Sequence, residues 1–131
     1  MIEKNYNLSK LFLGLWAIGA LISFILQFFL SETLSSLSLW NNSFGWQREI
    51  ALWDIGAFVA ISYALKLKNA EIYKFLILFL SLLSLLLGTN HLITIILSGN
   101  IQTVNVLGVI FNYLIVIVIL GFYIYKKEKS I

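Results

Sequence analysis

The chain has 131 residues, of which 60% are hydrophobic and only 11% are charged, and its mean hydropathy is +0.94. A soluble domain is about 45–50% apolar and about 25% charged, so this composition is typical of a membrane protein with lipid as its partner. Cysteine is absent, which excludes disulfides, thiolate metal sites, iron–sulfur clusters and thiol catalysis. The net charge of +3 is not gathered into a basic run, so we expect no nucleic-acid partner.

Four apolar stretches predict a single all-α membrane domain, residues 1–131, built as a bundle of four transmembrane helices. The first stretch, residues 11–30, follows a short polar lead-in and is long enough to cross a hydrocarbon core of about 30 Å. A cleaved signal peptide is the alternative for this stretch, but its apolar region would span only about 7–15 residues. The other predicted spans are residues 47–65, 73–97 and 106–125.

The connections between the predicted spans differ in character. Residues 31–46 are serine-rich with apolar residues at helical spacing, which indicates an outer loop or a short helix lying on the membrane surface. Residues 68–71 are a tight polar connection, and residues 98–105 contain Gly99 and no charge, which predicts a turn.

Basic residues set the predicted orientation. When four helices are threaded through the membrane, eight lysines fall on one side and Arg48 falls on the other. Positive charge is retained on the cytoplasmic side, so we expect both termini to be cytoplasmic in a multi-pass protein of the cell membrane. The lysines are Lys4, Lys10, Lys66, Lys68, Lys74, Lys126, Lys127 and Lys129.

Strongly polar residues of all four spans fall at similar depth in the outer half of the predicted membrane. Asp54 lies about 10 Å and His91 about 9 Å below the outer boundary at 1.5 Å per residue, and Asn90 is one residue deeper. Asn112 lies about 9–12 Å below that boundary, and Gln27 lies about 5 Å below it. A carboxylate at this depth costs several kcal/mol unless it is paired or wetted, so Asp54 requires a partner.

Small residues recur at three- and four-residue spacing on three of the spans, and such stripes indicate the faces that point into a bundle. These faces carry Gln27, Asp54 and His91, so we expect Asp54 and His91 to meet inside the bundle. The stripes are Ala20, Ser23 and Gln27; Asp54, Ala57, Ile61 and Ala64; and Ser81, Ser84, Gly88, His91 and Thr94. Four further glycines are interpreted as packing positions: Gly14, Gly19, Gly108 and Gly121.

The polar residues also have structural interpretations. A hydrogen bond or ion pair that holds two helices together explains Asp54 as well as a function does. A histidine satisfied by Asp54 is favoured over a metal ligand, because the chain has one histidine and no thiolate, and we predict no metal or cofactor. Arg48 and Glu49 are interpreted as a charge pair at the outer boundary, with Glu49 at the positive end of the helix dipole. In the alternative, Glu49 guards an opening to the site below.

Four motifs carry a family resemblance: Trp46-Gln47-Arg48-Glu49-Ile50-Ala51-Leu52-Trp53-Asp54-Ile55-Gly56, Gly88-Thr89-Asn90-His91, Ser98-Gly99-Asn100 and Asn112-Tyr113-Leu114. They resemble a family of small four-helix prokaryotic membrane proteins of unknown function, distantly similar in architecture to DoxX-like proteins. The resemblance implies an acidic residue at Glu49, an asparagine where this chain has Asp54, and an aspartate where it has Asn112. Exchange of Asp and Asn between two positions fits a shared polar cluster with one acid. The resemblance implies no activity.

Three functions are compatible with these observations. The first is binding or passage of a proton, a cation or a small polar molecule, and a His–Asp pair in low dielectric would make it sensitive to pH. Four helices are few for alternating access, so a transporter would need a homo-oligomer. The candidate residues are Gln27, Glu49, Asp54, Asn90, His91 and Asn112.

The second function is a structural or accessory subunit of a membrane complex. The third is a DoxX-like redox enzyme subunit, with His91 as general base oriented by Asp54. It ranks last because the sequence holds no set of nucleophile, base and orienting residue, and we assign no catalytic residue.

Overall fold

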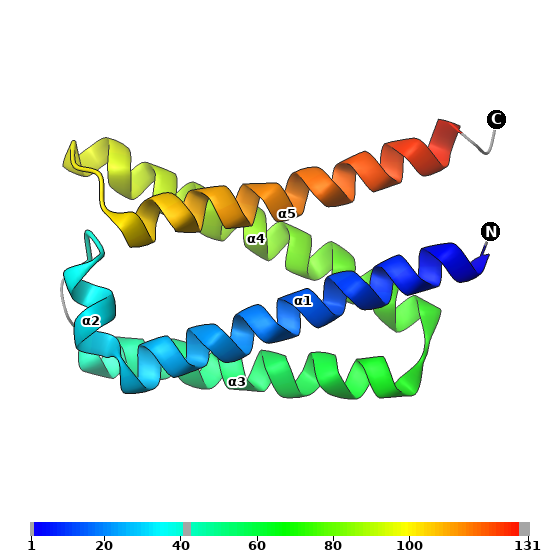
Figure 1. Ribbon diagram of the computed structural model, residues 1–131, viewed down its shortest axis with the longest axis horizontal. Helices are drawn as coiled ribbons and strands as arrows, with labels where there is room; N and C mark the ends of the chain where they lie inside the picture. Colours follow the sequence, from blue (N-terminus) through cyan, green and yellow to red (C-terminus); the bar gives the residue numbers. More distant parts are fainter. Residues whose placement is uncertain (1, 41–42, 129–131) are drawn as a thin grey trace. The chain divides into compact units, whose positions relative to one another are not determined.

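All regular elements in the described part of the chain are α-helices (Figure 1), which confirms the all-α prediction there. The computed structural model describes residues 2–40 and 43–128, and the side chains of residues 7–40 and 43–119. The helices are α1 (Ile2–Phe29), α2 (Ser31–Ser36), α3 (Phe44–Leu67), α4 (Ala70–Ser98) and α5 (Thr103–Glu128).

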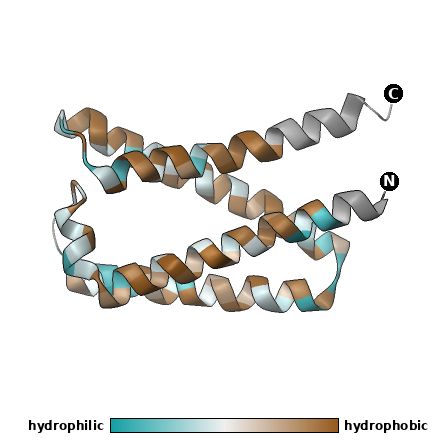
Figure 2. Ribbon diagram, viewed as in Figure 1, coloured by the Kyte–Doolittle hydropathy of each residue, from teal (hydrophilic) through white to brown (hydrophobic). Residues whose placement is uncertain are grey.

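Three of the helices are long and apolar enough to cross a membrane: Asn7–Phe29 within α1, all of α3 and all of α4. The described apolar part of α5 is shorter, Thr103–Ile119. Figure 2 shows apolar residues along most of each long helix and polar residues gathered at the connections. The chain therefore has the helix lengths and composition of a membrane protein, as the sequence predicts.

The helices extend beyond the predicted apolar spans. α1 begins at Ile2, so the polar lead-in expected at residues 1–10 is mostly helical. No glycine or proline interrupts residues 2–10, and lysine and glutamate are good helix formers, so backbone hydrogen bonding continues past the apolar stretch. The predicted loop at residues 31–46 contains the short helix α2, and α3 already begins at Phe44.

Few residues of the three long apolar helices are buried. The buried share is 17% in the α1 and α3 spans and 22% in the α4 span. In water, exposed apolar surface costs about 25 cal/mol per Å² relative to burial, whereas lipid tails are as apolar as the side chains themselves. The fold is therefore suited to lipid as its solvent.

The chain divides into two compact units, and each is described by itself. Unit 1 contains Met1–Ser36 and Trp40–Leu78, and unit 2 contains Leu37–Leu39 and Phe79–Ile131. α1 packs against α3 in unit 1 (Figure 1). The buried apolar residues of these two helices are mostly small, which allows their backbones to approach closely: Leu13, Ala17, Ala20, Ala51, Ile61 and Ala64.

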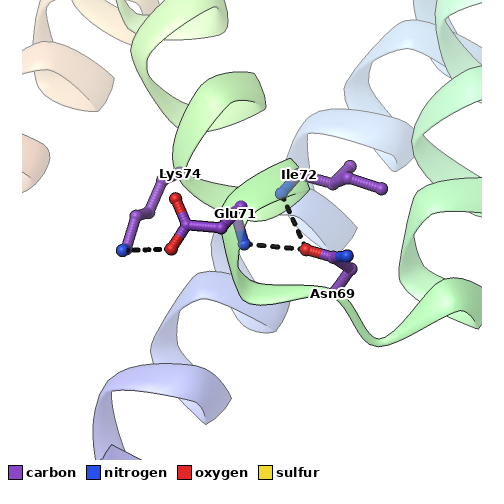
Figure 3. A network of polar contacts seen from close by, with 4 residues as sticks. All are labelled: Asn69, Glu71, Ile72 and Lys74. Atoms are coloured by element: carbon purple, nitrogen blue, oxygen red, sulfur yellow. Dashed lines mark hydrogen bonds and ion pairs between the residues drawn. The ribbon is translucent and has the colours of Figure 1, made fainter.

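The connection between α3 and α4 is two residues long and is closed by polar contacts (Figure 3). Lys68 follows α3 with a left-handed backbone, φ 53°. Asn69 caps α4, because its Oδ1 accepts hydrogen bonds from the backbone N–H groups of Glu71, at 2.9 Å, and Ile72, at 3.2 Å. Lys74 forms an ion pair with Glu71 in the first turn of α4. The predicted tight connection at residues 68–71 is confirmed.

Tyr73 holds the same turn together from within unit 1. Its side chain is 1% exposed, and its hydroxyl donates a hydrogen bond to the backbone carbonyl of Leu65 at 3.0 Å. The last four carbonyls of a helix have no partner within the helix, so Tyr73 satisfies a group that α3 leaves open.

We expect Tyr73→Phe to lower the free energy of unfolding by about 1 kcal/mol, because it removes the hydrogen bond to Leu65 and keeps the ring. Reversible unfolding in mixed detergent micelles measures the change. Tyr63→Phe is the matched control, since Tyr63 is 63% exposed on α3. Equal losses in the two variants would show that the Tyr73 hydroxyl does not stabilise the turn.

The connection between α4 and α5 is shorter than predicted. α4 ends at Ser98, and Gly99 follows with φ +66°, in the left-handed region that glycine adopts without steric cost. α5 already begins at Thr103, so only residues 99–102 separate the two helices.

Candidate functional site

In unit 1 a polar contact joins α1 to α3. The Nε2 amide of Gln27 donates to Ser23 Oγ at 3.1 Å and to Asp54 Oδ2 at 3.2 Å, so both amide hydrogens are engaged. Ser23 also hydrogen-bonds the half-buried carboxylate of Asp54. The structure therefore brings together two of the predicted site residues, Gln27 and Asp54. Ser23, from the same small stripe of α1, completes the contact.

The described hydrogen-bond partners of Asp54 are neutral groups. Gln27 supplies an amide and Ser23 a hydroxyl. Within the residues that the structure describes, Asp54 forms no ion pair; the ion pair there joins Lys74 and Glu71. Neutral donors stabilise a carboxylate but do not cancel its charge. A charge within an apolar helix is unfavourable in free energy. Asp54 is therefore the position in unit 1 where binding of a proton or cation would be most favourable, because it would compensate the charge of the carboxylate.

Arg48 and Glu49 are exposed near the start of α3. Arg48 Nε donates to the backbone carbonyl of Phe44 at 3.2 Å. In the described part of the chain the two side chains do not form an ion pair with each other. α3 begins at Phe44, so Glu49 lies beyond its first turn, and the predicted interaction with the helix dipole is weaker than expected.

In unit 2, α4 and α5 pack closely through two glycines. A Cβ atom at Gly108 would collide with Cδ2, Nε2 and Cε1 of His91, so the imidazole lies directly against the backbone of α5. A Cβ atom at Gly88 would come within 3.1 Å of Asn112 Cβ and 3.3 Å of the Tyr113 ring. These contacts confirm that Gly108 is a packing position. At Gly14 and Gly19 a Cβ meets nothing within 4 Å, so their role as packing positions stays a prediction, and the side-chain position of Gly121 lies outside the described residues.

Polar groups surround these two glycines. Asn112 Nδ2 donates to the Gly108 carbonyl at 2.7 Å. Thr89 Oγ1 donates to the Leu85 carbonyl at 2.8 Å and lies 3.1 Å from Tyr113 Oη. Because the Thr89 hydrogen is used by Leu85, Tyr113 is the donor to Thr89, and its oxygen keeps the capacity to accept a hydrogen bond. A polar ligand that carries donors would find acceptors here.

His91 and Asn112 therefore both lie against Gly108, His91 with its ring and Asn112 with its amide. Asn90 does not join them: its side chain is exposed, and its backbone carbonyl accepts a hydrogen bond from Thr94 Oγ1 at 2.8 Å. Similar depth does not place consecutive residues on one face, because each residue turns the helix by about 100°. Asn90 lies on an exposed face of α4, and its place in the site stays a prediction.

The predicted meeting of Asp54 with His91 is a relation between the two units. Asp54 and Gln27 belong to unit 1, whereas His91 and Asn112 belong to unit 2. The pairing of the carboxylate with the imidazole therefore stays a prediction. Among the residues that the structure describes, no group of three or more His, Cys, Asp or Glu side chains is placed to hold a metal ion.

No protein family, curated protein or solved structure matches the chain. The resemblance to the family of small four-helix membrane proteins rests on the short motifs alone and stays a prediction. The candidate sites of this chain are therefore its two polar clusters, one around Asp54 and one around His91.

Proposed function

We propose that this chain is a multi-pass protein of the cell membrane that binds or passes a proton, a cation or a small polar molecule at Asp54. In this proposal α5 is a fourth span, since its 26 residues reach about 39 Å, and both termini are cytoplasmic. The distribution of eight lysines against Arg48 supports that orientation.

The observation that carries the proposal is the carboxylate of Asp54 with neutral partners in the middle of an apolar helix. Gln27 and Ser23 orient this carboxylate and leave its charge uncompensated. Ionisable groups within membrane spans are expensive to keep, so they usually serve a function. A proton or a monovalent cation compensates the charge of Asp54 without any further acid in unit 1.

The cluster of unit 2 holds further polar candidates for binding a ligand. The positions of His91 and Asn112 along their helices predict a depth in the membrane similar to that of Asp54. An imidazole can bind and release a proton, so His91 is the second proton-binding candidate of the chain. Asn112 and Tyr113 provide acceptors for a polar ligand, and Glu49 is an exposed carboxylate near the start of α3.

The decisive experiment measures flux into proteoliposomes under an imposed gradient of protons, Na⁺ or K⁺, with an enclosed dye that is sensitive to the ion tested. We expect Asp54→Asn to reduce proton or cation flux at least tenfold, because the amide is not a titratable acid and has no negative charge to attract a cation. Glu71→Gln makes the same chemical change at an exposed carboxylate and should leave flux within twofold. If folded Asp54→Asn carries the wild-type flux, Asp54 is not the binding group.

A second candidate function is a structural subunit of a membrane complex. The contacts Gln27–Asp54 and Thr89–Tyr113 each join two helices, as polar contacts between membrane helices do. If Asp54 only pairs helices, Asp54→Asn should lower the unfolding temperature while flux and cellular phenotype stay at the wild-type level. No observation favours the redox-enzyme alternative, and we do not propose it.

A further inference from the structure

The segment Leu37–Leu39 docks on the first turn of α5 within unit 2. The backbone N–H of Val104 donates to the carbonyl of Leu37 at 3.0 Å, and the N–H of Leu39 donates to Asn105 Oδ1 at 2.8 Å. The first N–H groups of a helix lack partners within the helix. The carbonyl of Leu37, far from α5 in the sequence, therefore caps α5. In return the Asn105 side chain of α5 accepts a hydrogen bond from the Leu39 N–H.

Asn105 is a fully buried polar residue, at 0% exposure. The Leu39 N–H requires an acceptor, so the carboxamide must present its oxygen there and direct its nitrogen elsewhere. That nitrogen, Nδ2, is buried and has no hydrogen-bond partner in the described part of the chain. A buried donor without an acceptor is unfavourable, so the acceptor contact with Leu39 is the interaction that accounts for an asparagine at this position.

α2, which directly precedes this segment, is held by a different residue in unit 1. Gln47 Nε2 donates to the Ser31 carbonyl at 3.3 Å and to Ser35 Oγ at 3.4 Å. The chain passes from unit 1 to unit 2 after Ser36 and returns at Trp40. Two consecutive pieces of the same connection are thus attached to different units by two different carboxamide side chains.

We propose that Leu37–Leu39 is a strap that docks on α5 through Asn105 and can undock without loosening α2. In the docked state the strap caps α5 at Val104. In the undocked state the Val104 N–H loses the Leu37 carbonyl and the Leu39 N–H loses Asn105 Oδ1. Gln47 still binds α2 to α3. This inference does not depend on the proposed function, because it concerns neither Asp54 nor His91.

The test is residue-resolved amide hydrogen exchange, measured by NMR on the full chain in lipid nanodiscs. In Asn105→Ala we expect the Leu39 and Val104 amides to exchange at least tenfold faster. The Leu34 amide of α2, bonded to the Leu30 carbonyl, should change less than twofold. Asn100→Ala is the matched control, because it removes an exposed carboxamide from the neighbouring connection and should change none of these amides.

Two further variants complete the test. Asn105→Asp keeps an acceptor oxygen near the positive end of α5 and should keep the protection of Leu39 within twofold of the wild type. Gln47→Ala should accelerate exchange at Leu34 and spare Leu39 and Val104. The proposal is overturned if Asn105→Ala leaves Leu39 protected, if it loosens Leu34 equally, or if Asn105→Asp behaves like Asn105→Ala.

Discussion

Gly108→Ala is expected to displace the imidazole of His91 and to weaken the contact between α4 and α5. The added methyl group would overlap three atoms of the His91 ring. We expect a loss of about 1–3 kcal/mol in the free energy of unfolding, as for other overpacked positions. Unfolding in mixed micelles measures the loss. His91 is the only histidine, so its imidazole NMR signals report the displacement without overlap from another histidine.

The control for this prediction is the same substitution in open space. A Cβ at Gly14 meets nothing within 4 Å, so Gly14→Ala should stabilise α1 by about 0.5–1 kcal/mol through helix propensity. In a His91→Ala background the penalty of Gly108→Ala should disappear, because the colliding ring is gone. A penalty that persists without the ring would show that α5 rejects the methyl group for another reason.

Gln27→Leu is expected to destabilise the protein more than loss of the whole contact does. The single substitution takes the amide donor from Asp54 and leaves its carboxylate half-buried. Loss of a hydrogen bond to a charged group costs about 1.5–3 kcal/mol. Replacement of a buried polar pair by apolar residues is often close to neutral, so the double variant Gln27→Leu, Asp54→Leu should recover most of this loss.

Thermal and detergent unfolding of the two single variants and the double variant measure this coupling directly. Asn90→Leu is the control, since it removes an exposed carboxamide of α4 and should change the free energy of unfolding by less than about 0.5 kcal/mol. Additive losses in the double variant would show that Gln27 and Asp54 do not stabilise each other.

The helical class and the apolar segments were predictable because hydropathy is summed over about 20 residues, and single exceptions do not change the sum. The helix ends were less predictable. Hydropathy reports where the chain prefers lipid, whereas a helix ends where backbone hydrogen bonding ends. Polar helix formers therefore carry α1 back to Ile2, and Asn69 rather than the first apolar residue sets the start of α4.

The contact between Gln27 and Asp54 was partly predictable, because helical periodicity placed both residues on small stripes that favour close packing. Asn90 shows the limit of this reasoning, since depth along a helix does not fix direction around it. Asn105 was not predictable from local pattern. Its partner Leu39 is 66 positions away in the sequence, and nothing near either residue encodes that meeting.

The α3–α4 and α4–α5 connections each begin with a residue in a left-handed backbone conformation. Lys68 and Gly99 both have a left-handed backbone, with φ 53° and +66°. That conformation costs a residue with a side chain about 1–2 kcal/mol and costs glycine almost nothing. In the proposed orientation Lys68 belongs to the connection that must stay in the cytoplasm, where lysine directs membrane insertion. At this position, membrane insertion would favour lysine, whereas the left-handed backbone would favour glycine. The lysine favours correct insertion at the expense of a strained turn.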